Sequence, residues 1–250
     1  MSTDLNRKKL PFPQELAYVI GILTMAFGVS CVSASNFGYS MIVAPAYLLF
    51  AKLGGLISFG TAEYLLQGCL LILLCIMIRR FRWQYLLSFV TAVIYGYTFD
   101  LMLMLVGYID ASALPVRIIL FAVGTLFISL SVALFVRTYV APEVYELFVR
   151  EYAVVHSLPF GRVKLIYDCI SCLVSIVLSI VLFGFGVFAD FSFPALGQAI
   201  LNGCVLEGIG IGTVIAALVN GPLITLFGNY FDRHFTYTRW EKAAKLLQVS

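Results

Sequence analysis

Long apolar runs separated by short polar connections dominate the pattern along the chain. Six of these runs hold roughly 20 mostly apolar residues each, which is the length that a helix needs to cross the ~30 Å hydrocarbon core of a bilayer. They lie at residues 16–36, 60–79, 84–107, 115–137, 163–188 and 205–229. The pattern therefore predicts an all-α, polytopic membrane protein with six transmembrane helices.

Two further apolar segments, residues 41–54 and 140–156, are too short to cross a bilayer. Each carries a proline near its start, Pro45 in the first and Pro142 in the second. Proline is tolerated in the first turn of a helix, where its missing N–H would have no partner in any case. We expect two short half-helices that are re-entrant or lie at the membrane surface.

The distribution of basic residues along the chain favours one membrane topology. Positively charged residues favour the cytoplasmic side of a membrane, whereas acidic residues contribute little to orientation. Only Lys52 and Arg117 fall in the outer connections, which also hold Glu63, Asp110 and Asp190. All other basic residues fall on one side: Arg7, Lys8, Lys9, Arg79, Arg80, Arg82, Arg137, Arg150, Arg162, Lys164, Arg233, Arg239, Lys242 and Lys245. Both termini are therefore expected in the cytoplasm, with the protein in the cell membrane. A cleaved signal peptide ending near residues 33–35 is the competing interpretation.

Landmarks of the first half recur in the second half in the same order. Residues 43–45 (Val-Ala-Pro) recur at 140–142, Phe-Gly recurs at 59–60 and 160–161, and Ser88, Gly96 and Asp100 have the spacing of Thr213, Gly221 and Thr225. Each half then contains three spans, so the second copy must be inverted relative to the first. We predict inverted 3+3 repeats at residues 1–110 and 111–230, followed by a cytoplasmic amphipathic helical tail at 231–250. Such repeats are typical of secondary transporters.

Composition narrows the function further. Of 250 residues, 62% are hydrophobic and 12% are charged, which matches a multispanning membrane protein and excludes a nucleic-acid-binding role. No catalytic motif is present, so an enzyme is not expected. Neither a metal nor another cofactor is expected either, because Cys169-x-x-Cys172 has no second pair at metal-site spacing.

Three motifs spread over the chain resemble one known family. They are Gly210-Ile211-Gly212-Thr213 followed by Gly221-Pro222-Leu223, residues 58–62 (Ser-Phe-Gly-Thr-Ala), and residues 134–137 (Leu-Phe-Val-Arg) leading to Ala141-Pro142. Together they resemble the YczE/YyaS/YitT family of bacterial membrane proteins, and the resemblance implies a transporter-like protein. The family commonly has an acidic residue after this proline, a place that Glu143 or Glu146 fills here. The first half has Ala46 and Tyr47 after Pro45 instead.

Polar groups inside the spans are the candidate site residues, because burying an ionisable group in a bilayer is costly. Alternatives remain open for three of them. Asp100 would also fit the headgroup level, Asp168 would also fit a structural pair with Arg137 or Lys164, and Glu207 would also fit a solvated span end. The expected solute pathway comprises Gln67, Tyr95, Asp100, Arg137, Asp168, Glu207, Gly210, Gly212, Thr213 and Asn220, with Pro45, Pro142 and Glu143 on the half-helices.

These features together predict a transporter or permease for a small solute, coupled to protons or cations. A passive channel of similar architecture is the first alternative, and a non-transporting membrane subunit or regulator is the second. The expected partners are the lipid bilayer and a small-molecule or ion substrate, and the sequence leaves a homodimer open. The identity of the solute does not follow from the sequence.

Overall fold

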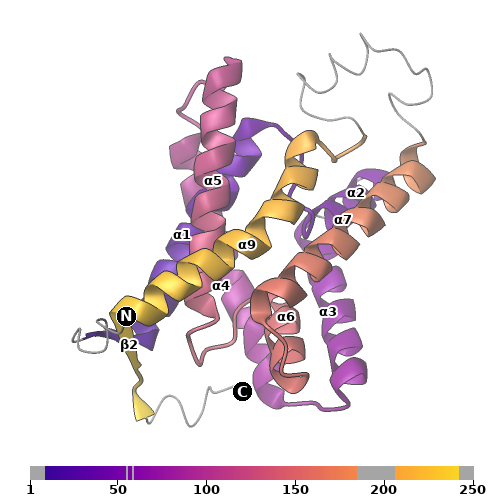
Figure 1. The fold of residues 1–250 in the computed structure, drawn as a ribbon. Helices are drawn as coiled ribbons and strands as arrows, with labels where there is room; N and C mark the ends of the chain where they lie inside the picture. Colours follow the sequence, from indigo (N-terminus) through magenta and orange to yellow (C-terminus); the bar gives the residue numbers. More distant parts are fainter. Residues whose placement is uncertain (1–8, 55, 58, 185–205, 242–250) are drawn as a thin grey trace.

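A computed structural model describes residues 9–54, 56–57, 59–184 and 206–241 of the chain (Figure 1). In this part of the chain six helices are long and apolar enough to cross a membrane, which confirms the predicted number of spans. They are α1 (Gln14–Ser35), α3 (Phe59–Ile78), α4 (Leu87–Val106), α5 (Leu114–Phe135), α7 (Phe160–Phe183) and α9 (Ile211–His234). A short 3-10 turn, η1 (Trp83–Leu86), leads directly into α4. The sixth span begins later than predicted, because residues 206–209 form a tight turn with a β-bridge ahead of α9.

The two short apolar segments form the helices α2 (Ala44–Leu53) and α6 (Val144–Val155). Pro45 lies in the first turn of α2, as expected. Pro142 lies just ahead of α6, whose N-cap residue is Glu143. The start of α6 is buried, whereas residues 154–158 at its far end are exposed.

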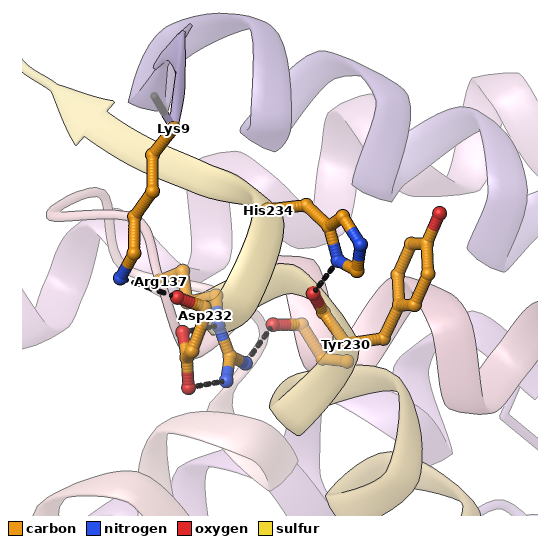
Figure 2. Close-up of polar contacts among 6 residues, drawn as sticks. Lys9, Arg137, Tyr230, Asp232 and His234 are labelled. Carbon is orange, nitrogen blue, oxygen red and sulfur yellow. Dashed lines mark hydrogen bonds and ion pairs between the residues drawn. The ribbon is translucent and has the colours of Figure 1, made fainter. Parts of the chain in front are cut away.

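Both ends of the described chain meet at one end of the helix bundle, which we call the terminal end. There β1 (Leu10–Pro13) pairs in parallel with β2 (Phe235–Thr238). Figure 2 shows the polar contacts beside this pair. Arg137, just after α5, forms two hydrogen bonds with the carboxylate of Asp232 near the end of α9, and Lys9 donates to the carbonyl of Asp232 at 2.7 Å. Asp232 therefore joins the ends of α5 and α9 to the segment before α1.

The tail departs from its predicted conformation. The sequence pattern predicts an amphipathic helix from residue 231, but α9 ends at His234 and residues 235–238 form β2. The Phe-Thr-Tyr-Thr sequence alternates aromatic and β-branched residues, which favour a strand when a partner strand is present. The ring of Phe12 in β1 packs on Phe235 and Tyr237 and so covers one face of the pair. Residues 242–250 lie outside the described part of the chain.

Helices α1 and α5 pack side by side and run in opposite directions (Figure 1). Arg117 at the start of α5 donates to the carbonyl of Ser35 at the end of α1. Gly28 and Gly124 lie where the two helices cross. A Cβ on Gly28 would lie 2.8 Å from the carbonyl oxygen of Gly124, and a Cβ on Gly124 would lie 2.6 Å from that of Gly28. Only residues without a side chain permit so close an approach of two backbones.

The other helices pack around this central pair. Helix α4 packs on α1, and α9 packs on α5. The short helices α2 and α6 each contact both α3 and α7. Helix α9 also packs closely on α7, where a Cβ on Gly221 would lie 2.9 Å from the carbonyl oxygen of Gly161. No comparable packing joins α3 and α4 within the described ranges, and a Cβ on Gly96 of α4 would meet open space.

Candidate functional site

Charged side chains gather inside the bundle where α3, α6 and α7 meet. This charge cluster consists of four acidic residues and one lysine: Glu63 on α3, Glu143 and Glu146 at the start of α6, and Lys164 and Asp168 on α7. The exposed fractions of Glu146, Lys164 and Asp168 are 5%, 1% and 0%, and Glu63 and Glu143 are half-buried. A protein rarely buries so many ionisable groups together without a structural or functional reason.

Lys164 is the cation of the cluster. Its Nζ lies 2.8 Å from Oε1 of Glu146 and 3.2 Å from Oδ1 of Asp168, one turn further along α7. These contacts do not satisfy both carboxylates. Oε2 of Glu146 and Oδ2 of Asp168 are buried and have no hydrogen-bond donor among the described residues. Buried acceptors without donors are costly.

Glu63 and Glu143 form the other end of the cluster. Oε2 of Glu63 accepts hydrogen bonds from the hydroxyl of Tyr145 at 2.9 Å and from Nε2 of Gln67 at 3.2 Å. Glu143 begins α6 without a side-chain capping bond. Neither Glu63 nor Glu143 takes part in the ion pairs that the described residues form.

The cluster carries more negative than positive charge. Four ionised carboxylates against one ammonium would leave three uncompensated negative charges in a largely buried site, which costs roughly several kcal/mol for each fully buried ion. Burial, followed by the neighbouring carboxylates of Glu63 and Glu146, raises the pKa of Glu143 well above its usual value. Such an arrangement takes up protons or another cation readily.

Neighbouring residues hold the start of α6 in place. Nη1 of Arg150 donates to the carbonyl oxygens of Thr138 and Val140, both at 3.2 Å. Thr91 on α4 donates to the carbonyl of Ala141 at 2.7 Å. Burial lowers the pKa of Arg150 to about 10, so the guanidinium stays charged at neutral pH. These bonds fix the backbone just before Glu143.

Comparison with known proteins places the chain in a family. Residues 12–189 match a family described as "Family of unknown function (DUF6198)". The chain belongs to this family. It is also 30% identical over 220 residues to a Bacillus subtilis (strain 168) protein described as "Uncharacterized protein YyaS", an alignment that covers 87% of this chain and 94% of that protein. No solved structure gives a significant match. The resemblance to YyaS-like proteins is thus confirmed, and this DUF6198 protein has the six apolar helices of a multi-pass bacterial membrane protein.

Several of the predicted pathway residues of this DUF6198 protein lie together. Gln67, Glu143 and Asp168 belong to the charge cluster or touch it, and Pro142 immediately precedes Glu143. Tyr95 on α4 lies within electrostatic reach of both Glu143 and Glu63. Of the two partners considered for Asp168, the structure selects Lys164.

The remaining predicted residues lie elsewhere. Arg137 pairs with Asp232 at the terminal end. Asp100 is exposed on α4, and Glu207 is exposed in the turn before α9, where it accepts a hydrogen bond from Tyr47. A separate group lies at the start and middle of α9. The backbone N–H of Gly210 donates to the hydroxyl of Thr213, which in turn donates to the carbonyl of Tyr39. Gly212 packs on Phe37, and the side chain of Asn220 accepts a hydrogen bond from Ser129 of α5. Pro45 lies on α2, and Asp190 lies outside the described residues.

Four residues around the site were not predicted as site residues by the pattern of spans. The assignment of charges to the two sides counts Glu63 and Lys164 with the connections, although both lie near the start of predicted spans (60–79 and 163–188). The structure places both inside helices, and Tyr145 and Glu146 are the other two residues. A signal for the first pair does exist in the sequence. When the two halves are aligned by the offset that relates residues 59–60 to 160–161, Glu63 aligns with Lys164 and Gln67 aligns with Asp168. In both halves, therefore, a charged residue is followed one turn later by a polar partner.

Proposed function

We propose that this protein is a secondary transporter for a small solute, built from two inverted repeats and coupled to protons or to another cation. Residues 1–110 and 111–230 form the repeats, and the termini are cytoplasmic. The observation that carries the proposal is the charge cluster, whose acidic excess lies among three packed helices. Two similar halves packed in opposite senses give a site near mid-membrane that each side of the membrane can reach in turn.

The packing of the helices supports inverted repeats. In this arrangement α1, α2, α3 and α4 of the first repeat correspond to α5, α6, α7 and α9 of the second. A contact in one repeat should then have an equivalent in the other: α5–α9 is equivalent to α1–α4, and α3–α6 is equivalent to α2–α7. Both members of each equivalent pair occur. The α1–α5 contact is its own equivalent, and its crossing is formed by Gly28 and Gly124, which face each other reciprocally. The corresponding helices α1 and α5 run in opposite directions, as inversion requires.

The contact between α7 and α9 has no counterpart of similar extent between α3 and α4, and this difference supports a transport cycle. Helix α9 packs on α7 through Gly221 and Gly161, but the corresponding α4 does not close on α3 through Gly96. Exchanging the conformations of the two halves would close the α3–α4 side and open the α7–α9 side. Two states related in this way expose a central site alternately to the two faces of the membrane.

The acidic excess of the cluster supports coupling. Glu63 and Glu143 retain solvent-accessible surface, and no cation of the described chain pairs with them. Protonation or binding of a cation at these residues removes uncompensated charge and so favours a state in which the site closes. A passive pore has no need for such a charge-dependent equilibrium, which is why a coupled carrier is preferred here.

The variant Glu143→Gln is expected to lose coupled transport. Reconstituted wild-type protein should give solute-driven currents on a solid-supported membrane, tested with a panel of small solutes, and these currents should depend on pH. Glu143→Gln cannot ionise and should lower the current at least about tenfold, equivalent to ~1.4 kcal/mol. Asp110→Asn, in an exposed turn, is the matched control and should behave as wild type.

Other outcomes of this experiment favour the alternatives. Currents in Glu143→Gln with unchanged pH dependence would contradict the role of the cluster. Flux that no ion gradient drives would favour a passive channel. Absence of flux together with a stoichiometric membrane partner in the purified protein would favour a non-transporting subunit.

The variant Gly96→Leu is expected to separate transport from stability. The added side chain meets open space in this conformation, so the melting temperature should stay close to that of wild type. Closure of α4 on α3 would be blocked, so transport should fall about tenfold or more, a loss of at least ~1.4 kcal/mol. Leu101→Phe adds bulk on a different, exposed face of α4 and should leave transport intact. Normal transport in Gly96→Leu would rule out the proposed closure.

A further inference from the structure

The two ends of the charge cluster differ in how their charges are balanced. At one end Lys164 lies within 3.2 Å of carboxylate oxygens of both Glu146 and Asp168, and all three residues are almost fully buried. At the other end Glu63 and Glu143 remain accessible and enter none of the ion pairs found in the described ranges. Among the described residues, positive charge is thus provided at the first end only. We call the second end the Glu63–Glu143 site.

The hydrogen-bond acceptors of this site exceed its donors. Both protein donors to Glu63, the Tyr145 hydroxyl and the Gln67 amide, reach the same oxygen, Oε2. The bond from Nε2 fixes the amide of Gln67 beside this carboxylate. Its carbonyl oxygen Oε1 is buried and finds no donor in the described part of the chain, and the exposed fraction of Gln67 is only 3%. A ligand that fits here brings N–H or O–H donors as well as positive charge.

The geometry argues against a bare metal ion. No group of three or more His, Cys, Asp or Glu side chains among the described residues lies close enough together to hold a metal. The site has aromatic neighbours instead. Tyr145 bonds directly to Glu63, and Tyr95, which stacks on Phe99, lies in the electrostatic field of both carboxylates. Carboxylates combined with aromatic rings suit an organic ammonium group, because the ring faces attract cations and the ring surface accepts its alkyl part.

We propose that the Glu63–Glu143 site binds a protonated primary amine, whose ammonium pairs with the two carboxylates and donates to Oε1 of Gln67. Its alkyl part lies against Tyr95 and Tyr145. This amine would be the solute of the transport function proposed above. Its transport rests on that proposed function, but its binding does not. A quaternary ammonium has no N–H group and would leave the Gln67 carbonyl without a donor, so it should bind less well.

The test compares cations at equal ionic strength. The melting temperature of the purified full-length protein in detergent is measured with n-butylammonium chloride, tetramethylammonium chloride or sodium chloride. A ligand that binds the folded state raises the melting temperature by mass action. A saturable rise is expected with n-butylammonium, and a much smaller one with the other two salts. Glu143→Gln and Gln67→Leu should each require at least about tenfold more n-butylammonium, whereas Asp110→Asn should match wild type.

The outcomes separate this inference from the proposed function. Equal shifts with all three salts, or an unchanged n-butylammonium response in Glu143→Gln, would overturn amine binding at this site. Gel filtration and the ligand-free melting temperature establish that Glu143→Gln is folded. Coupled flux of some other solute without n-butylammonium binding would refute the amine proposal and leave the transporter proposal standing. Binding with the expected selectivity but no flux would support the site and contradict transport.

Discussion

Lys164→Met is expected to lower the free energy of unfolding by about 3–5 kcal/mol, the usual cost of removing one partner from a buried ion pair. Lys164 is 1% exposed and contacts the carboxylates of Glu146 and Asp168, which the same substitution would leave without a cation. Methionine keeps much of the length of the side chain, so the loss of charge dominates over the loss of volume. Unfolding in mixed detergent micelles, followed by circular dichroism, measures the effect.

Acidification provides an internal check on the Lys164→Met result. Lower pH neutralises carboxylates that the variant leaves uncompensated, so the loss of stability relative to wild type should become smaller as the pH falls. The double variant Lys164→Met/Asp168→Asn should likewise regain part of the loss, because the two residues are coupled. If the loss in the free energy of unfolding stays constant with pH and is unaffected by Asp168→Asn, packing rather than charge explains the effect.

Gly124→Ala is expected to destabilise the protein by about 1–3 kcal/mol, although it adds only one methyl group. The new Cβ would lie 2.6 Å from the carbonyl oxygen of Gly28 and 2.7 Å from Cγ2 of Val32. Backbone cannot move aside as a flexible side chain does, so α1 and α5 would have to separate along their length. Thermal unfolding of the purified protein measures the loss.

Gly96→Ala is the matched control for this second prediction. Gly96 also lies inside an apolar helix, but its Cβ would meet no atom within 4 Å. Alanine there should be neutral or stabilising by roughly 0.5–1 kcal/mol, the ordinary helix preference for alanine over glycine. Gly28→Ala should resemble Gly124→Ala, and the double variant should cost less than the sum, since both methyl groups enter one crossing. Equal effects at positions 96 and 124 would contradict the close crossing.

The candidate site was only partly predictable from the residues. The cost of a carboxylate in an apolar run directed attention to Asp168, and a proline at a short helix directed it to Glu143. The same argument also selected Asp100, which lies exposed on α4 away from the ion pairs of the cluster. Glu63 and Lys164 lie only a few residues from the ends of their apolar runs, where a charge costs little, so the cost of burial does not single them out as site residues. Their burial depends on α6, which packs against both α3 and α7.

By itself the sequence determined the number of spans and the places of the two short helices. Apolar length and proline position are local properties, and a bilayer turns them directly into helices because every backbone group must be satisfied within its own segment. Only the tertiary structure decided that Lys164 faces Glu146, that Gly28 meets Gly124, and that residues 235–238 form a strand against β1 instead of extending a helix. Each of these features depends on groups brought together from distant parts of the chain, and no local pattern contains their partners.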